Sequence, residues 1–140
     1  HYGIDVVNDT IGDTDPITEQ EVRNVLAAGD GVVIDIRTTV TEEGVESLGM
    51  GNYIYIEHDI NGLKYITKYG HLRYGSILVK KGDQVEKGQP IATIGNTGNS
   101  TGDHLHFQVL IEGNPVNPGG LFPMDECFWP PLFTECRMEA

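Results

Sequence analysis

The sequence predicts an all-β sandwich or barrel with long loops and little helix. Short runs rich in Val, Ile and Tyr alternate with segments rich in Gly, Asn and Asp, as in strands joined by turns. The 18 glycines fall in these turns, and no phosphate-binding fingerprint accompanies them. Many short strands with few helical segments are typical of a sandwich or barrel.

The expected elements follow this pattern in order. Residues 18–26 are expected to form a short helix, because Thr18 can cap it and Glu19 and Glu21 suit its first turn. Residues 38–51 and 96–102 are expected to be loops, since Gly, Asn, Ser, Thr and Glu dominate them. Strands are expected over 31–37, 52–58, 63–72, 77–80, 90–95 and 103–111.

Size and charge exclude several classes of protein. A chain of 140 residues with 39% hydrophobic residues can form one domain with a core. Its net charge of −12 argues against nucleic acid and against anionic membranes as main partners, because both attract basic surfaces. Apolar runs such as residues 32–34 are far shorter than the roughly 20 residues that span a bilayer. We therefore expect no membrane span.

The two ends of the chain carry separate expectations. No leader is visible before His1, so we expect that a leader or an upstream regulatory segment is missing, or that the chain was cut here. Residues 121–140 are expected to be a tail outside the main domain, residues 1–120. The tail contains Cys127 and Cys136, which either form a disulfide worth roughly 2–3 kcal/mol or remain free thiols.

The segment 101–107 contains two histidines on one expected strand. Side chains alternate between the two faces of a strand, so His104 and His106 lie on the same side. Leu105 and Phe107 then fill the opposite, core-facing side. Two neighbouring imidazoles can both bind a metal, or can divide metal binding and proton transfer between them.

Further candidate ligands lie elsewhere in the chain. His1 is followed by Asp5, and His71 ends the expected strand 63–72. A catalytic zinc site commonly uses three protein ligands and one open position, and imidazole and carboxylate groups both suit zinc. His58 adjoins the turn at 59–62, and we expect it to cap that turn.

The motifs occur in a specific order along residues 1–118. They comprise HYGID at 1–5, AAGDGVV at 27–33, GNYIYIEH at 51–58, YGHL at 69–72, KGDQVEKGQ at 81–89, GNTGNSTGDHLHF at 95–107 and PVNP at 115–118. Together they resemble the lysostaphin/LytM-type zinc endopeptidases of the bacterial cell wall. That resemblance implies an antiparallel β-sheet with a groove that holds the metal, within a peptidase domain at residues 1–120.

The resemblance also implies roles for five residues. His1, Asp5 and His106 would bind Zn²⁺, while His71 and His104 would be the catalytic pair beside it. One of this pair would take a proton from water and the other would stabilise the developing oxyanion; the spacing does not say which. The implied reaction is hydrolysis of peptide bonds in peptidoglycan, in the stem peptide or the cross-bridge, by a secreted or periplasmic enzyme.

Some features of the chain depart from this family or leave alternatives open. Residues 11–24 and 38–49 look expanded, which would reshape the rim of the groove. By strand alternation Tyr65, Thr67 and Tyr69 share the face of His71, so they either line the groove or pack within the sheet.

Three other functions compete with the peptidase. The chain could be a non-catalytic relative that binds the cell wall or a protein partner. It could be a biotinyl- or lipoyl-like carrier, since residues 79–89 resemble a turn-rich segment of such domains, although no lysine stands out at a hairpin tip. It could bind copper through the amine and ring of His1, which leaves Asp5 and the strand pair unexplained.

Overall fold

The computed structural model describes residues 4–6, 24–98 and 105–116, with the backbone alone at 4–6 and 116. Nearly all regular structure in these residues is β-strand, so the predicted fold class is confirmed. No helix within the described residues has the length and apolarity needed to cross a membrane. The elements are β1 (Ile4–Val6), β2 (Asn24–Leu26), β3 (Gly31–Arg37), the 3-10 turn η1 (Glu46–Leu48), β4 (Asn52–Ile60), β5 (Leu63–Leu72), β6 (Gln84–Val85), β7 (Pro90–Thr93), β8 (Leu105–Ile111) and β9 (Asn114–Val116).

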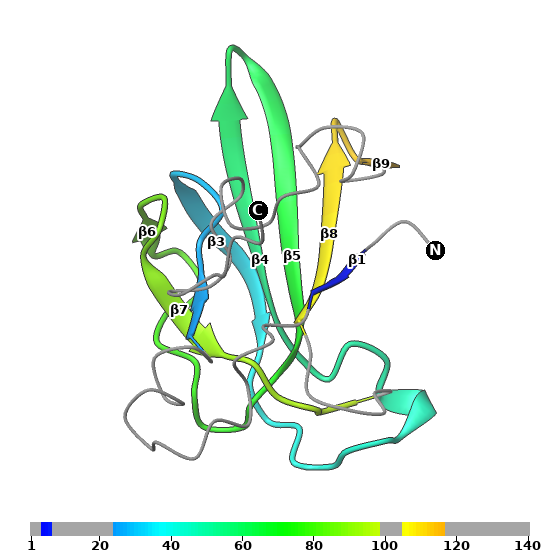
Figure 1. The fold of residues 1–140 in the computed structure, drawn as a ribbon. Coiled ribbons are helices and arrows are strands. Elements are labelled where there is room, and N and C mark those ends of the chain that lie inside the picture. Colours follow the sequence, from blue (N-terminus) through cyan, green and yellow to red (C-terminus); the bar gives the residue numbers. More distant parts are fainter. Residues whose placement is uncertain (1–3, 7–23, 99–104, 117–140) are drawn as a thin grey trace, which may run out of the picture.

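A large antiparallel sheet organises the described part of the chain. Its strands follow the order β1-β8-β5-β4-β3-β6, and β9 pairs with β8 beside β1. The strands β2 and β7 form a second, two-stranded antiparallel sheet. Figure 1 shows the long β4–β5 hairpin at the centre of the large sheet, with β8 and β1 on one side and β3 and β6 on the other.

The hydrophobic core lies on one face of the large sheet. Alternate residues of its central strands are buried there, and residues of β2 and β7 belong to the same cluster. Because alternate positions are apolar, these strands bury one face and leave the other for polar side chains. The largest side chains that are fully buried are Tyr69, Phe107, Ile54, Ile56, Leu72, Ile91, Ile94 and Leu105.

A chain of hydrogen bonds crosses this core face. The carbonyl of Asp30 can only accept, so Nδ1 of His58 donates to it at 2.8 Å. In the neutral ring, Nε2 of His58 then accepts from the Thr67 hydroxyl at 2.7 Å, and Thr67 accepts from the Tyr69 hydroxyl at 2.8 Å. The backbone N–H of Ala28 donates to Tyr69 at 2.9 Å, which completes the chain.

Burial determines the protonation states of His58 and Tyr69 in this hydrogen-bond network. Desolvation lowers the pKa of His58 and outweighs the opposing effects of the Asp30 carbonyl and carboxylate. Desolvation also raises the pKa of Tyr69 to about 12. Both groups are therefore neutral near pH 7, as the pattern of donors and acceptors requires. The prediction that His58 caps the adjacent turn is wrong, because both of its ring nitrogens bond within the core.

Other local predictions also need correction. The predicted helix at 18–26 is wrong for 24–26, which form β2, because Val25 and Leu26 are buried and pair with β7; residues 18–23 lie outside the described residues. The predicted strand at 77–80 is absent from the described fold, since Leu78 alone bonds to the β7 backbone there. The strand β9 was not predicted, and it contains Pro115.

The end of β5 carries a β-bulge that changes which side chains share a face. Asn52 pairs with Leu72 and Ile54 pairs with Tyr69, so β5 contains one extra residue between these pairs. His71 lies in this segment with φ of 60°, a left-handed conformation that is uncommon for residues other than glycine. Strand alternation therefore fails between Tyr69 and His71.

Candidate active site

The centre of the candidate site is His106 on β8. Its neighbours Leu105 and Phe107 are fully buried in the core, whereas His106 is half-buried on the outer face of the sheet, as alternation predicts. In the register of the sheet, Gly70 of β5 is directly opposite His106 on one side. Asp5 of β1 is directly opposite His106 on the other side. Asp5 and His106, two predicted zinc ligands that lie far apart in the sequence, are therefore directly opposite each other on neighbouring strands.

His71 is held in place by two backbone contacts. Its ring Nδ1 donates to the Thr97 carbonyl at 2.7 Å, and its backbone N–H donates to the Met50 carbonyl at 2.6 Å. A carbonyl oxygen can only accept, so this contact places a proton on Nδ1 of His71. The residue is only 6% exposed, so its backbone and ring both have a defined orientation.

The rings of His71 and His106 lie close together. Their centroids are 6.0 Å apart with an interplanar angle of 75°. The structure thus brings together two of the five predicted site side chains and places the backbone of Asp5 beside them. His1 and His104 lie outside the described residues, as do Cys127 and Cys136.

The described side chains alone do not form a complete metal site. No three His, Cys, Asp or Glu side chains come together in the residues that the structure describes. Of the three predicted ligands, only His106 has a described side chain, so the ligand set stays a prediction.

The loop segment at Thr97, which accepts the hydrogen bond from His71, is itself held by several hydrogen bonds. Thr97 donates through its hydroxyl to the Leu72 carbonyl at 2.7 Å and accepts from the Asn52 N–H at 3.1 Å. The fully buried Asn52 amide bonds both the N–H and the carbonyl of Val40 at 2.8 Å. These contacts tie residue 97, the hydrogen-bond partner of His71, to both β4 and β5.

Three glycines permit close backbone approach around this loop. A Cβ on Gly51, which has φ of 61°, would lie 2.4 Å from the carbonyl of Thr97. A Cβ on Gly98 would lie 2.3 Å from the Gly51 nitrogen. A Cβ on Gly70 would lie 2.7 Å from Cε of Met50, so Gly70 leaves the space that Met50 occupies next to His106.

A row of rings and cations lies on the outer face beside His106. The rings of Tyr53 and Tyr55 stack with centroids 4.4 Å apart. The Arg37 guanidinium lies 5.2 Å from the Tyr53 centroid, and the Lys68 ammonium lies 4.5 Å from the Tyr55 centroid. Desolvation raises the pKa of both tyrosines, so both hydroxyls stay protonated at neutral pH. The hydroxyl of Tyr53 donates to Asp35 at 3.2 Å.

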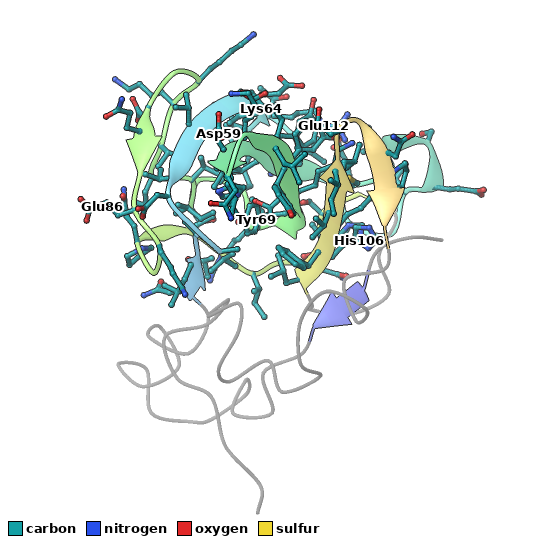
Figure 2. The ribbon with its side chains drawn as sticks, turned by 90° about the horizontal axis from the view of Figure 1, so that it is seen from above. Asp59, Lys64, Tyr69, Glu86, His106 and Glu112 are labelled. Carbon is teal, nitrogen blue, oxygen red and sulfur yellow. The ribbon has the colours of Figure 1, made fainter. Side chains whose placement is uncertain are left out.

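The structure decides between the two interpretations of Tyr65, Thr67 and Tyr69. All three face the core; Thr67 and Tyr69 are buried, and Tyr65 packs against the core cluster. Figure 2 shows Tyr69 inside the ring of strands, whereas His106 lies on the other side of β8. Tyr65, Thr67 and Tyr69 therefore do not line a groove with His71, because the bulge after Tyr69 moves His71 to the opposite face of the sheet.

Sequence reasoning did not identify four residues that shape this site. Thr97 acts through its backbone carbonyl, which no side-chain pattern reveals. Lys68 and Tyr55 share the outer face with His106 only because distant strands pair in this register. Met50 lies against Gly70, which is also next to His106, and the Tyr55 hydroxyl contacts its sulfur at 3.8 Å.

An open cleft of about 650 Å³ lies away from these histidines, between β3, β4 and β6. Figure 2 shows Glu86, one of its lining residues, at the opposite side of the molecule from His106. Four carboxylates and one lysine line it, so it is mainly an acidic surface. Its charged residues are Asp30, Glu57, Asp59, Glu86 and Lys64.

Comparison with known proteins identifies the family. The model of Peptidase family M23 matches residues 1–118, which is most of the chain. The chain belongs to peptidase family M23. This confirms the resemblance to lysostaphin/LytM-type enzymes that the motifs indicate.

Curated relatives of this M23 chain are longer proteins. Peptidoglycan DD-endopeptidase ShyA of Vibrio cholerae is 44% identical over 93 residues, which are 66% of this chain and 19% of ShyA. DD-carboxypeptidase/endopeptidase Mpg of Neisseria meningitidis is 39% identical over 94 residues, which are 67% of this chain and 19% of Mpg. The chain thus spans about a fifth of the length of these relatives.

Solved structures share the fold of the M23 chain. LytU is 32% identical with a TM-score of 0.60, and the match covers 86% of this chain and 71% of LytU. The catalytic domain of lysostaphin from Staphylococcus simulans is 29% identical with a TM-score of 0.58, covering 86% of this chain and 77% of that domain. A zinc-containing peptidase from Vibrio cholerae is 42% identical with a TM-score of 0.52, and the match covers 68% of this chain and 26% of that peptidase.

Proposed function

We propose that this chain is a zinc-dependent endopeptidase that hydrolyses peptide bonds of bacterial peptidoglycan, in the stem peptide or the cross-bridge. The observation that carries the proposal is the register of Asp5 opposite His106, together with the His71 ring 6.0 Å from the His106 ring. Membership of family M23 and similarity to a peptidoglycan DD-endopeptidase support it.

The available donor set suits zinc. Residues directly opposite each other in an antiparallel pair have Cβ atoms about 5 Å apart, a separation that permits two side chains to share one ion. A carboxylate at position 5 and an imidazole at position 106 are both good zinc ligands, and His1 is the third ligand implied by the motifs. When bound, zinc polarises a carbonyl group and makes water more acidic.

The proposed proton-transfer groups are His71 and His104. Because Nδ1 of His71 donates to Thr97, Nε2 is the atom that accepts a proton from water or donates one to the reacting oxygen. The hydrogen bond to Thr97 also stabilises the protonated ring that forms when Nε2 accepts a proton. His104 shares this role in the proposal.

Residues 1–120 form the peptidase domain in this proposal, and residues 121–140 form a C-terminal tail. Because peptidoglycan lies outside the cytoplasmic membrane, we propose that the protein works outside the cell or in the cell envelope. Its partners are peptidoglycan peptides.

Four single substitutions test the assignment of roles. We expect Asp5→Ala and His106→Ala to lose zinc and activity together, because each removes a ligand. We expect His71→Ala and His104→Ala to retain zinc and lose about 10²- to 10⁴-fold in turnover, the usual contribution of general acid–base catalysis. Metal analysis of each purified variant measures occupancy, and release of peptides from purified cell walls measures turnover.

The controls separate the competing outcomes. Gly62→Ala, in the exposed β4–β5 turn with no atom within 4 Å of its Cβ, serves as a folded control with intact metal and activity. Equal zinc loss in all four variants would show that the division into ligands and catalytic residues is wrong. Bound zinc with no hydrolysis of any cell wall would instead favour a non-catalytic wall-binding module.

A further inference from the structure

The outer face of the sheet continues past the His71–His106 pair. One two-residue step along β5 from Gly70 lies Lys68, which pairs with Tyr55 of β4 and Gln108 of β8. A step of two residues in a strand is about 7 Å. The backbone of Lys68 therefore lies about 7 Å along the strand direction from the level of His106, and Lys68 shares the face of His106 and Gln108.

The charge of Lys68 has no acidic partner in the described residues. Lys64, on the same strand and face, contacts Asp59 at 3.1 Å and Glu57 at 3.8 Å. Lys68 instead lies over the ring of Tyr55, and the structure gives it no ion pair with a described carboxylate. Lys64 is thus exposed and paired with two carboxylates, whereas Lys68 is half-buried against an aromatic ring and pairs with no carboxylate of the described residues.

The other cation of this row is already engaged. The guanidinium of Arg37 donates to the carbonyls of Gly51 and Leu48, both at 2.6 Å, and so fixes the loop that contains Met50. The stacked tyrosines extend from Arg37 to Lys68 and hold the Lys68 side chain against an aromatic surface. A half-buried ammonium in a fixed position loses less conformational entropy when it binds an anion than a fully mobile one.

The negative net charge of the chain makes the Lys68 cation important for binding an acidic ligand. With a net charge of −12, the chain repels an acidic ligand unless a cation lies at the binding site. The Lys68 ammonium, on the same face of the sheet as His106, supplies that local attraction.

We infer that Lys68 is a specificity-determining residue that binds a free carboxylate of the substrate peptide, about 7 Å along the sheet from His106. The inference rests on the proposed function and deepens it. The preferred substrate is then an anionic peptide, such as a stem peptide with a free side carboxylate, rather than an uncharged cross-bridge. Tyr55 positions the ammonium, and the scissile bond lies beside His71 and His106.

Direct binding tests this inference without requiring hydrolysis. The probes are two synthetic, uncross-linked stem tetrapeptides that differ only in whether the side carboxylate is free or amidated. Calorimetry with the full chain and zinc present measures the Kd of each. We expect the free carboxylate to bind about five- to tenfold more tightly, as for one partly exposed charge-assisted hydrogen bond. This preference decreases at high salt.

Three substitutions complete the experiment. Lys68→Met keeps the aliphatic stem and removes the charge, so it abolishes the preference by weakening binding of the free acid alone. Lys68→Arg retains the preference. The matched control Lys64→Met leaves both Kd values unchanged, because Lys64 faces Asp59 and Glu57.

The possible failures are distinguishable. Equal binding of both probes by the unsubstituted chain, or no binding of either, would overturn the role of Lys68. So would a preference that survives Lys68→Met. Loss of hydrolysis in cell-wall assays, with the carboxylate preference intact, would instead count against the proposed peptidase and leave the binding role of Lys68 supported.

Discussion

The two faces of β5 differ in how completely their polar side chains are hydrogen-bonded or ion-paired. On the core face, Thr67 and Tyr69 belong to a closed chain of hydrogen bonds in which each donor has an assigned acceptor. On the outer face, one residue away, Lys68 has an aromatic neighbour and no described carboxylate. A polar group buried without a partner is strongly destabilising, whereas a half-exposed one is not. Burial therefore requires completed bonds on one face and permits ligand-binding groups on the other.

The largest expected effect on stability comes from disrupting the contact between Gly51 and Thr97, the residue that hydrogen-bonds His71. In Gly51→Ala, the new Cβ meets the Thr97 carbonyl at 2.4 Å and the backbone has φ of 61°. We expect a loss of about 3 kcal/mol in the free energy of unfolding, from steric overlap added to backbone strain. Urea denaturation measures it, and cell-wall hydrolysis should fall as well, because Thr97 orients His71.

Gly62→Ala is the matched control for that prediction. Gly62 also has a positive φ, 83°, but its Cβ would meet no atom within 4 Å. We expect a loss of about 1 kcal/mol from strain alone, with hydrolysis unchanged. If both variants lost the same stability, steric contact with Thr97 would not be the cause.

A smaller effect is expected when the core-face chain is interrupted. Tyr69→Phe keeps the ring and removes the hydroxyl, so the buried N–H of Ala28 and the Thr67 hydroxyl each lose a partner. We expect a loss of about 2 kcal/mol in unfolding free energy, with turnover per folded molecule unchanged. Tyr74→Phe is the control, since Tyr74 is 56% exposed. Reduced turnover in folded Tyr69→Phe would contradict the separation of the two faces.

The smallest expected effect is a pH dependence of stability from His58. Burial lowers its pKa in the folded state below the ordinary 6.5, so above about pH 7.5 both folded and unfolded states are neutral at this site. As the pH falls below 6.5, the unfolded state binds a proton that the folded state does not. Stability then decreases by up to about 1.4 kcal/mol per pH unit until the folded pKa is reached.

Urea denaturation of metal-free protein at several pH values checks this prediction. His58→Gln removes the titrating ring, so its stability should change less between pH 6.5 and 5.5 than that of the unsubstituted chain. The difference between the two curves isolates His58 from other titrating groups. Parallel curves would show that protonation of His58 does not oppose folding.

The sequence predicts well where local pattern and tertiary structure agree. The run of Val and Ile at 31–37 forms β3 over the predicted residues, and residues 63–72 form β5. The outward position of His106 also follows from alternation, because Leu105 and Phe107 fill the core. In these segments each side chain's preference matches its place in the sheet.

Prediction fails where distant segments decide the outcome. The segment at 24–26 has residues suited to a helix end, but burial against β7 makes it a strand. His71 takes a left-handed backbone because Met50 and Thr97 hold it from other parts of the chain. Neither contact leaves a local sequence signal, so alternation assigned His71 to the wrong face. The roles of all five predicted site residues stay predictions, and His1 and His104 also lie outside the described residues.

The pairing of β1 with β8 has a consequence for the order of folding. About one hundred residues separate Asp5 from its strand partner His106, and β1 pairs with no other strand in the described fold. Closing a loop of this length costs conformational entropy, and the cost is smaller once part of the intervening chain has become ordered. During synthesis β1 emerges from the ribosome before β8, so it has no pairing partner until β8 has emerged. We therefore expect the junction of β1 and β8 to be among the last parts of this sheet to assemble.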